Sequence, residues 1–550
     1  MRESRMRDLQ QRSRRVMTVS VFTLGLVVAL ALGPVGHSPL VAADQPEKGG
    51  TIVFAVHEYG PSFDIHYETS YIAMQGLSPI YNGLVTYDLY DKAKIVGDLA
   101  ERWEVGDEGK RLTFPLRRGV KFHDGSDFTC ADAKWSLDRL ADPKRASATF
   151  AGILKELYAS SRCADDFTLV VSLKRPSVGF LSFLAGENAA IMKQGIDQRF
   201  DIKNPGFLVG TGPFKYKSHT PGVDFQGQRN PNYWKPGLPH IDGYRSVVMS
   251  DLTKIFASFR ARQLTMTGIF RHLERPEAEI LKKDFPDAVV VVGPRSTWHT
   301  YFMNVSAPPF NDLRVRTAVA LATDREKMIE IAVEGWGRLG GFMAPHLPYA
   351  LPLEDLKQFP QFQPNMDKRR AEAKRLLAEA GYPNGLTVEV VLRRGPLYER
   401  GALSRQDDLK KVGIIEKIVL LDTAGARDRQ LKGDFQAWEG PGSAHYDDPD
   451  MFYDRYVCEV GWNYSRYCNP EFDKLFKAQR TEFDVKKRIE ITRQMERILL
   501  ADIPEDRGYF WMATMGHWDR LQKWPPPVLG TMVYSYGKFE QVWCKGGKCM

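Results

Sequence analysis

The sequence predicts a mixed α/β (α+β) protein with more than one hydrophobic core. Runs of β-branched or alternating apolar residues recur along the whole chain, and helix start and stop signals lie between them. The chain has 550 residues, well beyond the ~250 to 300 residues at which a single core stops growing. Two or three lobes are therefore expected.

The strand predictions depend on six segments. Each is rich in β-branched or alternating apolar residues and is bounded by Gly, Pro or Asp. The segments are residues 51–56, 111–116, 168–173, 243–249, 288–292 and 386–392.

Helix signals are equally clear. Thr129 and Asp132 are spaced like a capping box that opens a helix over residues 131–140. Asp367 is expected to cap a second helix that stops at Gly381. A third helix is predicted before Pro504, from apolar residues near one helical face: Val485, Ile489, Met495, Ile498 and Leu499.

Composition excludes several classes of protein. Hydrophobic residues make up 43% and charged residues 26% of the chain, which excludes disorder, collagen and a polytopic membrane protein. Half of the net charge of +8 belongs to residues 1–43, and beyond them 70 basic side chains face 66 acidic ones. That balance provides no broad basic surface, so nucleic acid is not an expected partner.

The first 43 residues have the pattern of an export signal. An arginine-rich start precedes an apolar run from Val16 to Leu32, and Val41-Ala42-Ala43 has small residues at the positions that a signal peptidase recognises. We expect cleavage after Ala43 and a periplasmic location. An uncleaved membrane anchor is the alternative. Arg14 and Arg15 also resemble a twin-arginine signal, so the export route is open between Sec and twin-arginine.

Six cysteines suit an oxidising compartment. Cys458 with Cys468 and Cys544 with Cys549 each close a short loop, and Cys130 and Cys163 are then left in one region. Three disulfides are the simplest interpretation. A metal site is the competing one, but Cys-x4-Cys without a nearby histidine matches zinc spacing poorly.

Familiar catalytic motifs are missing. The sequence has no Gly-x-Ser-x-Gly, His-Glu-x-x-His or Gly-x-x-x-x-Gly-Lys-Ser/Thr motif, so we expect a protein that is not an enzyme and needs no cofactor. The stretch from His445 to Asp450 is acidic, and either a solvated turn or a hard-cation site would explain it. No metal is expected. The rival hypothesis is a periplasmic hydrolase of a peptide- or sugar-like substrate that uses an acidic pair such as Glu439 and Asp447.

Several longer motifs occur in an order that resembles one known family, the family 5 extracellular solute-binding proteins of ABC importers, of the peptide- and nickel-binding type. The resemblance covers residues 48–530. The motifs that carry it are residues 64–66, 99–105, 112–125, 128–129, 209–214, 229–234, 311–316, 322–325 and 376–382.

This resemblance implies a three-lobed, periplasmic-binding-protein-like fold, with a hinge between the two lobes that enclose the ligand. The first lobe would combine residues 44–82, 209–295 and 517–550, the second would be residues 83–208, and the third residues 296–516. Such a protein would act as a monomer that carries a small solute, a peptide or a conjugated compound, to an ABC permease in the inner membrane.

The resemblance also suggests where the solute is held. In peptide-binding relatives an acidic side chain after a Trp-containing strand binds the α-amino group, but here the alignment places Pro441 or His445 at that position. Glu439 or Asp447 are the possible substitutes. Arg393 and Arg394 resemble the segment that holds a ligand carboxylate, although a surface ion pair would also explain them.

Aromatic residues complete the predicted site. Trp298 falls where the first crossing into the third lobe is expected, and it either stacks on the solute or packs in the core. Trp438 and Tyr446 offer further apolar faces. A solute with an acidic or polar head and a flat or apolar body would suit this set of residues.

Overall fold

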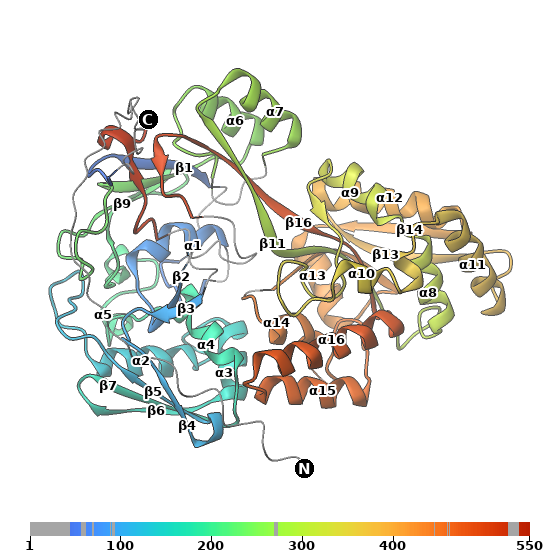
Figure 1. Cartoon of the computed structure of the whole chain (residues 1–550), viewed down its shortest axis with the longest axis horizontal. Coiled ribbons are helices and arrows are strands. Elements are labelled where there is room, and N and C mark those ends of the chain that lie inside the picture. The colour runs from blue at the N-terminus through green and yellow to red at the C-terminus, as the bar shows by residue number, and fades with distance from the viewer. Residues whose placement is uncertain are drawn as a thin grey trace, which may run out of the picture. The chain divides into compact units, whose positions relative to one another are not determined.

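A computed structural model of the chain describes residues 45–56, 62–68, 71–88, 90, 94–268, 273–444, 446–458, 460, 462–525 and 538–550 (Figure 1). Residues 46–550 form one unit by their contacts, and the structure is described within that unit. The predicted export signal, residues 1–43, lies outside the described residues. Helices alternate with both parallel and antiparallel strands, which confirms the predicted mixed α/β class.

The first sheet joins the N-terminal strand to the middle of the chain. Its four strands lie in the order β1-β10-β9-β8, with β1 parallel to β10 and the others antiparallel. Phe54 and Tyr244 of this sheet share one hydrophobic cluster with Cys544 and Cys549, so the C-terminal segment packs against the first strand. The strands of this sheet are Thr51–Val56 (β1), Phe214–Thr220 (β8), Asp224–Arg229 (β9) and Gly243–Val248 (β10). The same region contains a separate pair of strands, Leu521–Gln522 (β17) and Trp543–Cys544 (β18), and the helices Tyr71–Leu77 (α1), Ile196–Arg199 (α5), Leu252–Arg260 (α6) and Arg275–Asp284 (α7).

The second sheet is antiparallel, with strands in the order β4-β5-β7-β6. The predicted capping box is present, because Thr129 and Asp132 close the start of α2 by reciprocal hydrogen bonds. Helices α2, α3 and α4 lie beside this sheet in Figure 1. The strands of this sheet are Glu104–Gly106 (β4), Arg111–Pro115 (β5), Tyr158–Asp165 (β6) and Thr168–Leu173 (β7). The same region contains a separate pair of strands, Val85–Asp88 (β2) and Lys94–Gly97 (β3), and the helices Cys130–Leu140 (α2), Ala148–Leu157 (α3) and Gly179–Leu184 (α4).

The third sheet has six strands, in the order β12-β16-β11-β15-β13-β14. Strand β13 is parallel to β14 and β15, and Val388 and Val390 on it are fully buried, as is usual for parallel strands covered on both faces. Its strands are Ala288–Met303 (β11), Gly337–Arg338 (β12), Leu386–Arg393 (β13), Ile414–Leu421 (β14), Ala437–Ser443 (β15) and Glu505–Trp518 (β16). The helices of this region are Leu313–Ala322 (α8), Arg325–Val333 (α9), Leu353–Leu356 (α10), Met366–Glu379 (α11), Pro396–Lys410 (α12), Thr423–Lys432 (α13), Pro449–Tyr453 (α14), Pro470–Thr481 (α15) and Val485–Asp502 (α16).

Strands β11 and β16 run from the third sheet to the first. They pair antiparallel from Ala288 opposite Trp518 to Phe302 opposite Glu505. Near the far end of β16, His517 forms a bridge with Met266, which also bridges β1. Figure 1 shows the two long strands side by side between the first sheet and the rest of the third sheet.

All six predicted strand segments are strands. One strand boundary and one helix boundary differ clearly from expectation. Strand β11 continues to Met303, well past residue 292, because its pairing with β16 shifts register after Pro294 and then resumes. The second predicted helix begins two residues earlier than expected. Its cap is Asn365, whose side chain accepts a hydrogen bond from the Lys368 backbone, while Asp367 lies in the first turn.

The cysteine prediction is confirmed. The structure contains the disulfides Cys130–Cys163, Cys458–Cys468 and Cys544–Cys549. The disulfide Cys130–Cys163 joins the start of α2 to β6, and so it fixes a helix beside the second sheet to an edge strand of that sheet.

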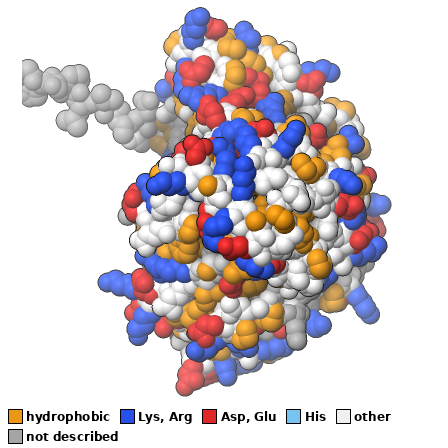
Figure 2. Space-filling model, turned by 90° about the vertical axis from the view of Figure 1, so that its right-hand side faces the viewer, with side chains coloured by type: hydrophobic (Ala, Val, Ile, Leu, Met, Phe, Trp, Pro, Cys, Tyr) orange, Lys and Arg blue, Asp and Glu red, His pale blue; other side chains and the backbone are white. Residues whose placement is uncertain are grey.

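The helices that cover the third sheet carry paired charges on their outer faces. Lys327 of α9 lies 2.7 Å from Asp407 of α12, and Lys411 lies at the same distance from that carboxylate. Figure 2 shows acidic and basic side chains intermixed over this side of the protein.

Candidate functional site

Trp298 lies on β11 and is fully buried. Its ring stacks on Phe452 with 5.6 Å between centroids, and the guanidinium carbon of Arg507 lies 3.9 Å from its centre. Its indole N–H donates a hydrogen bond of 2.9 Å to Glu505. Trp298 is therefore a core residue in this structure, and its stacking on a solute stays a prediction.

The neighbouring strand approaches Trp298 very closely at Gly442. A Cβ atom at position 442 would lie 2.3 Å from the Trp298 ring, so no other residue fits there without a shift. Gly442 therefore serves the packing of β15 on β11.

Glu439 lies on β15 and is fully buried in a network of charged groups. The Arg405 guanidinium donates to its carboxylate, and the ring of His299 lies 3.5 Å away. Burial raises the pKa of Glu439 to about 8, although Arg405 opposes this shift. Burial also lowers the pKa of His299 to about 3, so His299 is neutral at pH 7.

Strand β16 contributes three consecutive charged residues that the sequence analysis did not select: Glu505, Asp506 and Arg507. All three are buried. Asp506 forms ion pairs with Arg325 and Arg405, and Glu505 accepts a hydrogen bond of 3.1 Å from Arg507. Three consecutive charged residues directly before the apolar part of a strand were the available signal for a buried charged network, since buried charges need partners.

Trp438 points away from Glu439, as neighbouring residues of a strand do. It is buried with Phe302 and Tyr464, and its indole N–H donates to the carbonyl oxygen of Ala426 at 3.0 Å. Trp438 thus packs β15 against α13, and a role for it in solute binding stays a prediction.

Arg393 is the last residue of β13 and Arg394 follows it, at the strand end predicted from the sequence. Arg393 is partly buried, donates to the Thr423 hydroxyl at 3.2 Å and lies over the ring of Tyr398 at 5.4 Å. The side chain of Arg394 is exposed. Of the two, Arg394 is the one whose side chain lies open to solvent.

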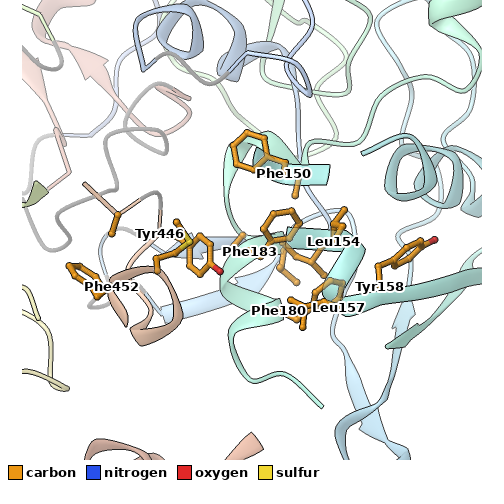
Figure 3. Close-up of a cluster of buried hydrophobic side chains, with 14 of the residues drawn as sticks. Phe150, Leu154, Leu157, Tyr158, Phe180, Phe183, Tyr446 and Phe452 are labelled. Atoms are coloured by element: carbon orange, nitrogen blue, oxygen red, sulfur yellow. The ribbon is translucent and has the colours of Figure 1, made fainter. Parts of the chain in front are cut away.

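The loop after β15 leads away from these arginines. Tyr446 is buried and meets Phe183 of α4 edge-on (Figure 3). The Ser296 hydroxyl donates to Asp447, whose carboxylate also lies 3.8 Å from the ring of His346. His445 lies outside the described residues.

The predicted site residues therefore occupy distinct surroundings. Trp298 and Tyr446 share one large hydrophobic cluster. Trp438 belongs to another cluster, and Glu439 belongs to the charged network. The arginines at the end of β13 are linked to the others through the sheet, since Leu392 pairs with Glu439.

Two hollows lie elsewhere in the described part of the chain. A cavity of about 20 Å³ is enclosed by Arg325, Asp506, Arg507 and their neighbours, room for about one water molecule. An open groove of about 520 Å³ runs past Arg117, Arg118 and Trp234. Among the described residues, no group of three or more His, Cys, Asp or Glu side chains is arranged to hold a metal ion.

The family model for bacterial extracellular solute-binding proteins, family 5 Middle, matches residues 94–464, and the chain belongs to this family. The resemblance found in the sequence is thereby confirmed. The protein is thus a solute-binding receptor by class. No helix in the described ranges is both long and apolar enough to cross a membrane.

Curated relatives extend over most of the chain. The periplasmic oligopeptide-binding protein OppA of Escherichia coli K12 is 28% identical over 445 residues, which is 77% of this chain and 80% of the relative. The glutathione-binding protein GsiB of Salmonella choleraesuis SC-B67 is 26% identical over 487 residues, 86% of this chain and 91% of the relative.

Solved structures agree on the fold. The periplasmic binding protein DppA of Helicobacter pylori, in complex with the peptide STSA, superposes with a TM-score of 0.75 at 22% identity and covers 90% of this chain and 98% of its own. AgaA from A. tumefaciens R10, in complex with agropinic acid, has a TM-score of 0.73 at 25% identity, with 90% and 99% covered. The periplasmic-binding-protein-like fold predicted from the sequence is confirmed.

Proposed function

We propose that this protein is a periplasmic receptor that closes around a small solute and delivers it to an ABC permease of the inner membrane. One structural observation carries the proposal: β11 and β16 belong to the third sheet at one end and reach the first sheet at the other. Two long strands between two packed regions can act as a hinge when those regions close. Family membership supports the same function.

The proposed lobes follow from this hinge. Residues 44–82, 209–295 and 517–550 would form the first lobe, residues 83–208 the second, and residues 296–516 the third. The first sheet supports the first grouping, because it contains β1 together with β8, β9 and β10. The solute would lie between the first and third lobes.

The solute is not expected to be held mainly by a free α-amino group. Glu439 is enclosed by Arg405 and His299, and Asp447 is engaged by Ser296 and lies near His346. Neither carboxylate is open to an incoming ammonium group. A buried ammonium without a carboxylate partner would cost several kcal/mol.

An acidic group on the solute has a better candidate partner. Arg394 is exposed at the end of β13, and Arg393 is fixed beside it by Thr423 and Tyr398. Guanidinium groups bind carboxylates with paired hydrogen bonds. The similarity to a glutathione-binding protein and to a structure that holds agropinic acid supports a modified peptide or an amino acid conjugate as the solute.

A thermal-shift screen of the purified protein tests the proposal. The panel contains dipeptides, longer peptides, glutathione, sugar and amino acid conjugates, and nickel chelates. At least one compound should stabilise the protein, by about 2.7 kcal/mol at a concentration a hundred times its Kd. Native mass spectrometry of protein purified without denaturation should show a retained solute and a monomer.

Matched arginine variants test whether Arg394 binds an acidic group of the solute. Arg394→Ala should weaken binding of the best compound at least about tenfold, which corresponds to ~1.4 kcal/mol. Arg375→Ala is the control, because Arg375 is also exposed and pairs with Glu372 and Glu379 of its own helix. An unmodified dipeptide that binds equally well to both variants would contradict the assignment.

Turnover assays separate this function from the rival hydrolase. The same compounds, incubated with wild type and Glu439→Gln, should remain intact. If wild type hydrolysed one of them and the variant did not, the receptor function would be wrong.

Export has its own test. N-terminal sequencing of protein recovered from the periplasm should begin at Asp44, as expected for cleavage after Ala43. A chain that begins at Met1 and remains with the membrane would indicate an anchor instead.

A further inference from the structure

One aromatic contact joins the second sheet to the third. Phe183 of α4 meets Tyr446 edge-on, with 6.4 Å between ring centroids. Phe183 also stacks on Phe180 at 6.3 Å, so its ring lies between its own helix and the loop after β15. In Figure 3, Tyr446 and Phe452 approach from one side and the cluster of Phe150, Phe180 and Phe183 from the other. Phe183 and Tyr446 are both buried, and each ring covers part of the other.

A polar contact lies beside the aromatic one. The backbone N–H of Val178 donates to the carbonyl oxygen of Arg480, at 3.1 Å. A Cβ atom at Gly179 would lie 3.1 Å from Asp448 and 3.3 Å from Asp450, so the start of α4 lies directly against two buried carboxylates. Glycine is the residue that permits this approach.

Both carboxylates have partners within the third region. Arg488 donates to the two oxygens of Asp448 at 2.9 and 2.7 Å, and Arg480 donates to Asp450 at 3.0 Å. Charged pairs of this geometry are rigid, since each oxygen is held in place. The surface that meets α4 is therefore fixed before the two regions touch.

Arg175 acts against the contact. Its two terminal nitrogens are buried without a hydrogen-bond partner. Burial and the nearby charge of Arg480 lower the pKa of Arg175, which shows that the surroundings disfavour its charge. Removal of a guanidinium from water without a partner costs free energy. Apolar burial thus favours the contact while Arg175 opposes it.

The same loop reaches the predicted solute position. Ser443 pairs with Thr297 of β11, and the Ala444 backbone donates to Ser296 at 2.9 Å. His445, one of the two positions where the alignment places the amine-binding acid of peptide-binding relatives, comes next in the sequence, and Tyr446 then contacts Phe183.

We infer that Val178 and Phe183, in contact with Arg480 and Tyr446, form a latch that closes the second region (residues 83–208) onto the third (residues 296–516). This inference rests on the proposed receptor function, because a latch has a role only if the third region swings about β11 and β16. Separation at that hinge breaks the Val178–Arg480 hydrogen bond and exposes both rings. The opposing effect of Arg175 keeps the latch weak enough to reopen for release.

Hydrogen exchange of the ligand-free protein, followed by mass spectrometry, tests the latch at the Val178 amide. Phe183→Ala should raise the exchange rate of that amide at least about tenfold. Arg175→Met keeps the length of the side chain and removes its charge, so it should lower the rate several-fold. Phe122→Ala is the control for loss of an aromatic ring within the same core, because Phe122 packs edge-on against Phe128, and it should leave the rate within about twofold of wild type.

Small-angle X-ray scattering provides a second measurement on the same samples. Phe183→Ala should increase the radius of gyration, and Arg175→Met should decrease it or leave it at the closed value. If both variants folded with wild-type exchange at Val178, or if Phe122→Ala had the same effect as Phe183→Ala, the latch would be wrong. The receptor function fails separately, through a solute screen in which nothing stabilises the wild type.

Discussion

The guanidinium carbon of Arg507 lies 3.9 Å from the centre of the Trp298 ring, so a side chain of β16 covers the principal aromatic residue of β11. One oxygen of Glu505 accepts hydrogen bonds from both residues, at 2.9 Å from the indole and 3.1 Å from the guanidinium. Buried cation–π pairs of this kind are worth about 2 kcal/mol. The two strands that connect the sheets are thus joined by side chains as well as by backbone pairing.

Replacement of Arg507 by lysine should therefore be costly despite the retained charge. Lysine cannot lie flat on Trp298 while it also donates to Glu505 and Tyr456 as Arg507 does. We expect a loss of about 2 to 3 kcal/mol in the free energy of unfolding, measured with urea. Arg314→Lys, at an exposed pair with Asp312, is the matched control and should change stability by less than about 0.5 kcal/mol. Equal losses would contradict the special role of Arg507.

The buried pair of Arg405 and Glu439 predicts a non-additive result. Arg405→Met leaves Glu439 without its cation in a fully buried position, which should cost about 3 to 5 kcal/mol. The double variant Arg405→Met with Glu439→Leu removes both charges and should be more stable than Arg405→Met alone. Urea unfolding of the wild type, the two single variants and the double variant measures the coupling. Strict additivity would show that the pair does not act as a unit.

The three disulfides should differ in their contribution to stability. Their cysteines are separated by 33, 10 and 5 positions. In the chain-entropy model the corresponding gains are about 4, 3 and 2 kcal/mol. Paired alanine substitutions at Cys130 and Cys163 should therefore destabilise most, and those at Cys544 and Cys549 least. Mass mapping under non-reducing conditions verifies the pairings, and free thiols at Cys458 and Cys468 would contradict them.

His66 predicts a loss of stability in acid. It is fully buried, its Nε2 lies 2.9 Å from the Ala190 carbonyl oxygen, and burial lowers its pKa to about 4, with a further contribution from Arg139. Between about pH 6.5 and pH 4 the unfolded chain binds a proton that the folded protein does not. The stability present above pH 6.5 is therefore lost as the pH falls.

The variant His66→Gln isolates this effect, because glutamine can donate to Ala190 and does not titrate. From about pH 7.5 to pH 4.5, the wild type should lose about 2 to 3 kcal/mol more than the variant in urea unfolding. The same loss in both proteins would show that His66 does not contribute to the acid sensitivity.

Local and covalent features were predictable from the sequence. The capping box of Thr129 and Asp132 involves residues three positions apart, so its pattern is visible without a fold. Strand β13 is rich in β-branched and apolar residues and was identified almost to its end. The cysteine pairs followed from spacing and from the expected compartment.

The candidate site was only partly predictable. Arg394 was placed correctly at the end of a strand, where its side chain is exposed. The buried surroundings of Trp298, Trp438 and Glu439 were not, because a sequence pattern shows that a residue belongs to a strand but not which neighbours enclose it. The partners of Glu439 are a clear case, since Arg405 lies 34 positions away.

The sequence by itself determined the class of fold, six of its strand segments, three of its helices, the disulfides and the family. These follow from periodicity, short-range hydrogen bonding and motifs, all of which act over a few residues. Only the tertiary structure decided that Glu505, Asp506 and Arg507 form a buried charged cluster at the start of β16. Arg405 of α12 and Asp506 of β16 lie 101 positions apart, and such a buried pair exists only because α12 packs on the sheet that contains β16 and brings distant charges out of water together.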